Sequence, residues 1–180
     1  MNQGFQIRAT FPEIAHARVV QVRNTNDAMV VLKHRNPNYR LSTFSYTLGL
    51  MRGYLPVTVD EIADFIETGA MECGPLYAPT IKFLTANNDM NDEEGEFSLS
   101  MLAADEALEM RTSEKSPGFI LALEVSDQQI SEHGENFVIL KDLAQWESVQ
   151  CAFLVSPDGE ELTWFATQEI SNSLSDWLKA

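Results

Sequence analysis

The run of residues 119–125 is the segment that most constrains the fold of this chain. It is apolar almost throughout, and Ser116-Pro117-Gly118 breaks the chain just before it. A strand with one solvated face alternates apolar and polar residues, whereas a run such as this is typical of a strand buried on both faces. We therefore expect residues 119–125 to form a central strand of a β-sheet.

Weaker patterns predict the strands around this central one. Residues 52–57 indicate a short first strand, in which Pro56 favours an edge position or a strand end. Residues 76–84 predict either a strand or a strand that continues into a short helical turn, because Pro79 interrupts both. Two further strands are expected at residues 137–140 and 149–155.

Two helices are predicted from capping and spacing. Thr58-x-x-Glu61 is a capping box, followed by apolar residues at helical spacing and by Gly69 as a stop signal. A longer helix is expected over residues 92–111, where the acidic first turn suits the positive end of the helix dipole. Its expected apolar face consists of Phe97, Met101, Ala104 and Leu108.

The C-terminal region supports two alternatives. Apolar residues recur every three or four positions from Leu162 to Trp177, which favours a helix over that whole stretch. The turn signal Asp158-Gly159 instead favours a hairpin whose second strand is formed by residues 161–166. With the helix, the order of elements is β-α-β-α-β-β-β-α, which predicts an α+β fold, a two-layer sandwich with helices on one face of a mixed sheet.

The charge of the chain changes sign at Met51. Residues 1–50 hold six basic and two acidic residues, a net charge of +4, while residues 51–180 hold six basic and 25 acidic residues, a net charge of −19. Such asymmetry predicts a basic N-terminal extension at 1–50 and an acidic α+β domain at 51–180. Residues 17–23 and 28–33 indicate a hairpin within the extension, and the alternative is that translation starts at Met51.

From Met51 onward, four short segments carry a family resemblance. They are Met51-Arg52-Gly53-Tyr54-Leu55-Pro56-Val57-Thr58, Gly74-Pro75-Leu76, Glu93-Glu94-Gly95-Glu96-Phe97 and the apolar strand at 119–125. The sequence here resembles an uncharacterised, mostly actinobacterial family of small acidic proteins that open with Met-Arg-Val-Tyr-Leu-Pro-Ala-Thr. Gly53, Gly95 and Lys82-Phe83 depart from its pattern. The resemblance implies an α+β fold and a start at Met51, and it implies no activity.

Motifs for chemistry are sparse. The acidic cluster formed by Asp89, Asp92, Glu93, Glu94 and Glu96 lacks the glycine and the glutamate that an EF-hand loop needs at its sixth and twelfth positions, so we expect no metal site. Neither glycine-rich phosphate motif occurs, and we expect no cofactor. Cys73 with His133 is a weak nucleophile candidate, while Cys151 and the aromatic residues are expected in the core. Glu160 and Glu161 are expected in the first turn of a helix.

The sequence therefore favours an interaction or regulatory domain over an enzyme. Its charge excludes direct nucleic-acid binding by residues 51–180 and suits a basic protein partner. The absence of a long apolar run predicts no membrane span, and two separated cysteines favour a cytoplasmic location. The alternative is a small-molecule binder or an enzyme that uses the Cys73 thiol or a carboxylate cluster, with ligand-binding candidates Tyr54, Thr58, Glu93, Glu94 and Glu96 at a strand end and two helix starts.

Overall fold

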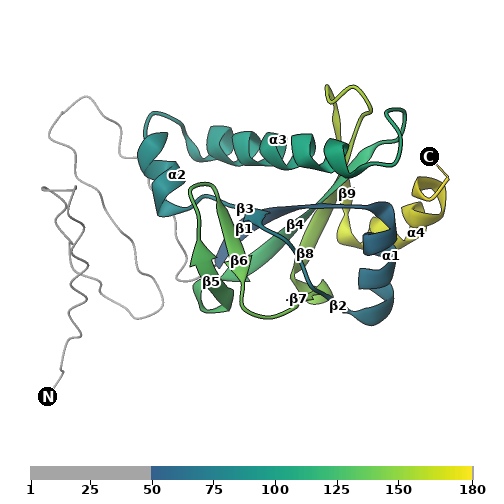
Figure 1. Ribbon diagram of the computed structural model, residues 1–180, viewed down its shortest axis with the longest axis horizontal. Coiled ribbons are helices and arrows are strands. Elements are labelled where there is room, and N and C mark those ends of the chain that lie inside the picture. The colour runs from purple at the N-terminus through teal and green to yellow at the C-terminus, as the bar shows by residue number, and fades with distance from the viewer. Residues whose placement is uncertain (1–49, 180) are drawn as a thin grey trace, which may run out of the picture. The chain divides into compact units, whose positions relative to one another are not determined.

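The computed structural model describes residues 50–179, so the expected basic extension and its hairpin lie outside the described residues. Nine strands and four α-helices make up this part of the chain (Figure 1). In chain order they are β1 (Leu50–Val57), α1 (Val59–Thr68), β2 (Ala70–Met71), β3 (Leu76–Tyr77), α2 (Ile81–Ala86), α3 (Asp92–Met110), β4 (Gly118–Ser126), β5 (Ile130–His133), β6 (Phe137–Leu140), β7 (Ala144–Gln145), β8 (Val149–Val155), β9 (Leu162–Ala166) and α4 (Thr167–Trp177).

The main sheet has seven strands in the order β5-β6-β3-β1-β4-β8-β9, while β2 and β7 form a separate small sheet. β4 lies between β1 and β8, and all of its residues but Glu124 and Ser126 are buried. The prediction of a central strand at residues 119–125 is therefore confirmed. The strands predicted at 52–57, 137–140 and 149–155 correspond to β1, β6 and β8.

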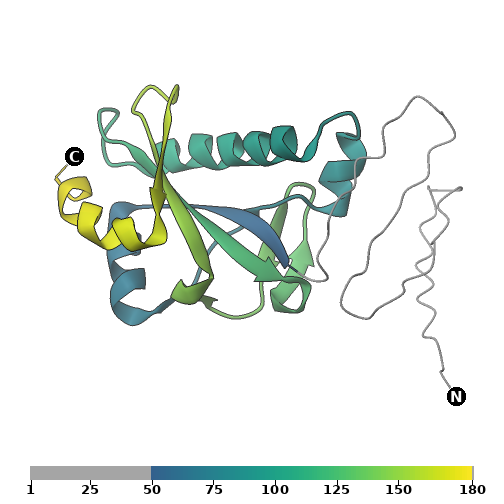
Figure 2. The same ribbon diagram turned by 180° about the vertical axis from the view of Figure 1, so that it is seen from behind.

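Helices cover both faces of this sheet. Phe119 and Leu121 of β4 pack with residues of α1 and α4, whereas Ile120 and Ala122 pack with residues of α3. Seen from behind, α3 lies along one side of the sheet, and α1 and α4 lie on the other (Figure 2). Since the alternate side chains of β4 are apolar on both faces, a single layer of helices would leave one set in water.

The α+β class is thus confirmed, and two details of the expected architecture differ. Helices lie on both faces rather than on one, for the reason just given. Every pair of neighbouring strands is antiparallel, so the sheet is not mixed. Strand direction depends on how each connection crosses the sheet, which periodicity along the chain does not encode.

The predicted start and stop of α1 are confirmed. The backbone N–H of Thr58 donates to Glu61 Oε2 at 2.7 Å, and the N–H of Glu61 donates to Thr58 Oγ1 at 3.3 Å, which closes the capping box. Gly69 ends the helix with φ at 77°, a left-handed conformation that favours glycine. Ile62 and Phe65 of this helix are fully buried.

α3 has nearly the predicted bounds but presents a different face to the sheet. Its buried residues are Gly95, Leu99, Ser100, Ala103, Ala104 and Ala107. Of the expected face only Ala104 is among them, and Phe97 is 62% exposed. Small residues occupy most of this face because the helix lies very close to the sheet. A Cβ on Gly118 of β4 would stand 3.1 Å from the backbone carbon of Ala107.

The two open alternatives are also resolved. Residues 162–166 form strand β9, antiparallel to β8, so the hairpin is correct and the helix begins only at Thr167. Trp177 of α4 packs edge-on to Phe165 of β9, with ring centroids 4.9 Å apart. Residues 76–84 form a two-residue strand and then enter α2, for which Thr80 is the N-cap.

Candidate functional site

Tyr54 and Glu96, two of the predicted ligand-binding residues, meet between β1 and α3. Tyr54 donates a hydrogen bond to Glu96 Oε2 at 3.3 Å, and Arg52 Nη1 lies 3.0 Å from the same oxygen. Residues 52 and 54 share a face of β1 because side chains alternate along a strand. Burial, followed by the negative charge of Glu96, raises the pKa of Tyr54 to about 12. The phenol is therefore protonated at neutral pH and acts as a hydrogen-bond donor, not as a base.

A second tyrosine forms the same kind of contact and was missed by the sequence analysis. Tyr77 of β3 donates to Glu106 Oε2 of α3 at 2.7 Å, and burial together with this hydrogen bond raises its pKa to about 12. Tyr77 is the direct partner of Tyr54 across the β1–β3 pair. The strand pairing that sets these two tyrosines side by side leaves no local signal in the sequence. Together the two contacts attach α3 to the sheet.

The other predicted ligand-binding residues lie apart from Tyr54 and Glu96 and are used in helix caps. Thr58 caps α1, as described above. Glu94 forms a capping box with Asn91, whose backbone N–H donates to Glu94 Oε2 at 2.9 Å. Glu93 is exposed in the first turn of α3. The structure thus brings two of the five predicted residues together and does not gather the carboxylates around one point.

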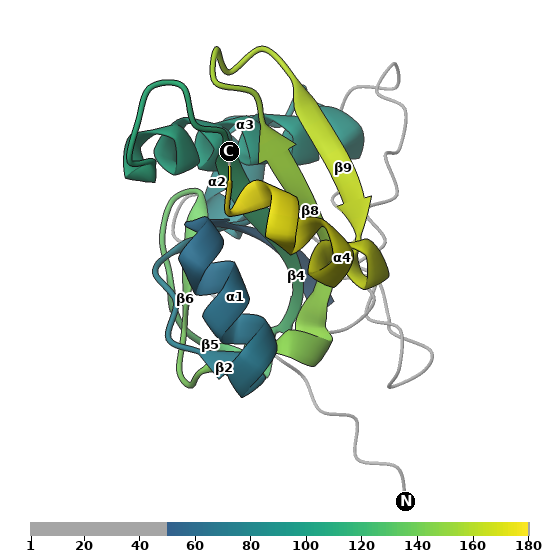
Figure 3. The ribbon, with the colours of Figure 1, turned by 90° about the vertical axis from the view of Figure 1, so that its right-hand side faces the viewer.

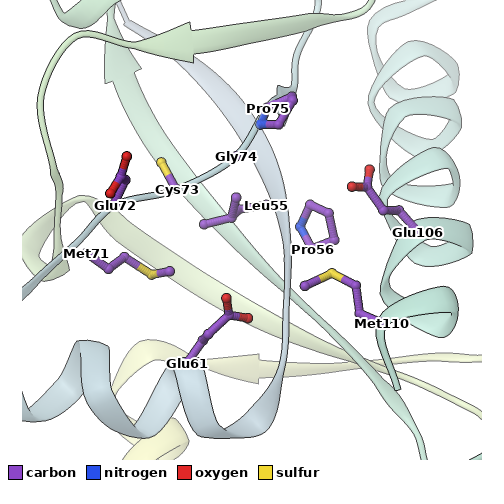
Figure 4. A pocket seen from close by; sticks show the side chains of 10 residues that line it. All are labelled: Leu55, Pro56, Glu61, Met71, Glu72, Cys73, Gly74, Pro75, Glu106 and Met110. Atoms are coloured by element: carbon purple, nitrogen blue, oxygen red, sulfur yellow. The ribbon is translucent and has the colours of Figure 1, made fainter. Parts of the chain in front are cut away.

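Cys73 lines a small pocket between β1, α1, α3 and the β2–β3 connection (Figure 4). Glu61 and Glu106 reach toward this pocket from α1 and α3. Its volume is about 90 Å³, well below the roughly 300 Å³ of a typical site for a drug-sized ligand. Burial raises the pKa of the Cys73 thiol, which reduces its nucleophilic thiolate form, and His133 is not among the lining residues.

The pocket exists because the sheet opens at two prolines. Continuing the Tyr54–Tyr77 register would set Pro56 of β1 opposite Pro75, and both of them line the pocket. Neither proline has an N–H to donate, so the β1–β3 ladder stops here. The predicted strand-end role of Pro56 is consistent with this local gap beside an otherwise central strand.

The acidic side chains are spread over the surface. None of the 25 in residues 51–180 is buried; Glu96 and Glu106 are half-buried, and the rest are exposed. Among the described residues, ion pairs join Arg52 to Glu96 and Asp176 to Lys179. No three His, Cys, Asp or Glu side chains of this part of the chain are placed to hold a metal ion. Most carboxylates therefore carry unneutralised charge.

The prediction that places Glu160 and Glu161 in the first turn of a helix is wrong. They lie in the β8–β9 hairpin and not in the first turn of a helix. The Glu160 N–H donates to Asp158 Oδ1 at 3.2 Å, and the Glu161 N–H donates to Ser156 Oγ at 2.9 Å. Their carboxylates are exposed beside the start of β9.

Comparison with known proteins adds a family assignment. Within residues 50–179, every helix is too short or too polar to cross a bilayer. Comparisons with curated proteins and with solved structures found no match. Residues 51–158 match a family of unknown function, DUF6912, which agrees with a resemblance that begins at Met51 and implies no activity. Because this match spans more than half of the chain, the protein belongs to the DUF6912 family.

Proposed function

We propose that residues 51–180 form a cytoplasmic interaction or regulatory domain that binds a basic protein partner. The observation that carries the proposal is the acidic surface: a net charge of −19 over these residues, with nearly all carboxylates exposed and few of them paired. Such a field accelerates the approach of a positively charged partner and makes the association sensitive to salt. The free thiols of Cys73 and Cys151 suit a reducing compartment.

The alternative, a small-molecule binder or an enzyme, has less support. Glu96 is engaged by Arg52 and Tyr54, and Thr58 and Glu94 are engaged in caps, so these groups are occupied by structural contacts. The thiol of Cys73 is held in its less reactive form by burial. The exposed carboxylates that form no such contacts are thus the better candidate for a functional feature.

The experiment is a pull-down from the native host with the full-length chain as bait, at about 50 mM and about 500 mM salt. The variant E132Q/E135Q/E160Q/E161Q removes four exposed negative charges, and Q128A/Q150A serves as the neutral control. We expect the wild type and the control to retain the same basic protein at low salt, and high salt or the charge variant to release it. Equal recovery under all conditions would refute a role for the acidic surface.

A further inference from the structure

β9 is an edge strand that lacks the features by which proteins usually protect such an edge. It pairs with β8 alone, and none of the described residues pairs with its other side (Figure 3). Its residues Leu-Thr-Trp-Phe-Ala include no charge and no proline, and its register with β8 is regular. The opposite edge, β5, contains Glu132 and a register shift between Ile130 and Glu132. Bulges and charges of that kind block the addition of a further strand, and β9 has neither.

The hydrogen bonds of the β8–β9 hairpin fix which backbone groups face outward. The N–H of Ser156 donates to the carbonyl of Glu161 at 2.9 Å, so residues 156 and 161 form a hydrogen-bonded pair. These pairs alternate in an antiparallel ladder, so Thr163 and Phe165 face β8, while Leu162 and Trp164 direct their N–H and C=O groups outward. Ala166 also faces outward, but its N–H donates to Glu169 Oε2 at 2.9 Å. The available edge therefore covers Leu162 and Trp164.

Trp164 provides a side chain suited to a cationic partner at this edge. It is 56% exposed, although its side chain lies close to that of Cys151 and it stands directly opposite Phe153 of β8. These contacts orient the indole ring on the α3 face of the sheet. Exposed tryptophan rings bind lysine and arginine side chains through cation–π interactions. Acidic residues flank the strand: Asp158, Glu160 and Glu161 precede it, and Glu169 follows it.

We propose that β9 accepts an extended, basic segment of a partner protein as an additional strand of the sheet. The backbone of that segment pairs with Leu162 and Trp164, and its lysine or arginine side chains lie over Trp164 and beside the acidic turn. This inference rests on the proposed function and assigns it a location. A second copy of this chain would also supply a strand, but it would bring a further net charge of −19 at residues 51–180 to an acidic edge.

The test is amide hydrogen exchange followed by NMR on the full-length chain, with a short peptide of alternating lysine and valine as the probe. We expect the peptide to slow exchange at Leu162 and Trp164 and to leave Thr163 and Phe165, which already face β8, unchanged. A peptide in which glutamate replaces lysine serves as the matched control and is expected not to bind. Slowed exchange at Leu162 and Trp164 that depends on protein concentration, without peptide, would overturn the proposal in favour of a second copy.

Two pairs of variants separate the contribution of the β9 edge to peptide binding from the contribution of the overall charge. Trp164→Val keeps the outward N–H, whereas Trp164→Pro removes it at a position where an edge strand tolerates proline. We expect Trp164→Pro to bind the peptide about five- to tenfold more weakly than Trp164→Val, because one backbone hydrogen bond is worth about that factor. E160Q/E161Q, next to β9, should weaken binding more than E132Q/E135Q at the opposite edge.

The outcomes distinguish this inference from the proposed function. Salt-sensitive binding of the lysine peptide that protects amides other than Leu162 and Trp164 would refute the β9 site and leave the acidic interaction domain standing. Equal binding of the lysine and glutamate peptides at β9 would refute the requirement for a basic segment. Failure of the lysine peptide to bind, together with salt-independent recovery in the pull-down, would refute both proposals. If Trp164→Pro fails to fold, amide exchange of the wild-type chain with the lysine peptide is the test of the β9 site.

Discussion

Gly118→Ala is the substitution that most sharply tests how closely α3 lies on the sheet. The added Cβ would stand 3.1 Å from the backbone carbon, 3.2 Å from the carbonyl oxygen and 3.2 Å from the Cβ of Ala107. Two of these three atoms are backbone, so no side-chain rotation relieves the crowding. Overpacking of this kind costs about 1–3 kcal/mol, and the reduced entropy of the unfolded chain returns about 0.4–1 kcal/mol. We therefore expect a net loss of about 0–2.5 kcal/mol in the free energy of unfolding relative to the wild type, and of about 1–3 kcal/mol relative to a Gly→Ala variant without crowding.

Urea denaturation of the full-length chain measures this loss, and Gly74→Ala is the matched control. A Cβ on Gly74 meets nothing within 4 Å, so this variant should be as stable as the wild type or slightly more stable. Tryptophan fluorescence, to which the buried Trp177 contributes together with Trp146 and Trp164, reports the unfolding of residues 50–179. We expect the two midpoints to differ by about 0.5–2 M urea. Equal midpoints would refute the close packing of α3 against β4.

Three further predictions follow from the contacts described above. Thr58→Ala should lower the free energy of unfolding by about 1 kcal/mol, because it removes the cap of α1, and should leave peptide binding unchanged, as calorimetry and urea denaturation would show. Leu99→Ala should cost about 2–5 kcal/mol in the same urea assay and Phe97→Ala far less, since Leu99 is fully buried and Phe97 is 62% exposed. The pKa of Tyr54 and of Tyr77 is raised from 10.0 to about 12, so the stability that their protonated phenols contribute is complete below pH 10 and is lost as the pH rises toward 12. Urea midpoints measured across that window should fall less for Y54F/Y77F than for the wild type, and an equal fall would contradict the two tyrosine–glutamate contacts.

Local patterns in the sequence predict those elements whose signals are themselves local. The capping box Thr58-x-x-Glu61 and the stop at Gly69 bound α1 correctly, because caps form within a few residues. The apolar run at residues 119–125 predicts the central strand β4, because burial on both faces requires apolar residues at nearly every position, and here only Glu124 is exposed. The turn at Asp158-Gly159 correctly indicates the β8–β9 hairpin, although helical spacing competes with it.

Features that depend on distant contacts could not be predicted in this way. Five of the six buried residues of α3 are small, and the close approach of β4 at Gly118 explains why they are preferred over Phe97 and Met101. The pairing of Tyr54 with Tyr77 requires the strand order, which joins residues far apart in the chain. Each of the five predicted ligand-binding residues has a side chain suited to binding a ligand. Thr58 and Glu94, however, are used in helix caps.

The open edge of β9 is the feature that gives the proposed function a location, and amide exchange in the free, full-length chain tests it most directly. We expect slow exchange at Thr163 and Phe165, which face β8, and at Ala166, whose N–H donates to Glu169. Leu162 and Trp164 should exchange fast, because nothing among the described residues accepts their outward N–H groups. Alternating fast and slow amides along residues 162–165 would support a strand edge open to a partner. Uniform protection across these residues would contradict it.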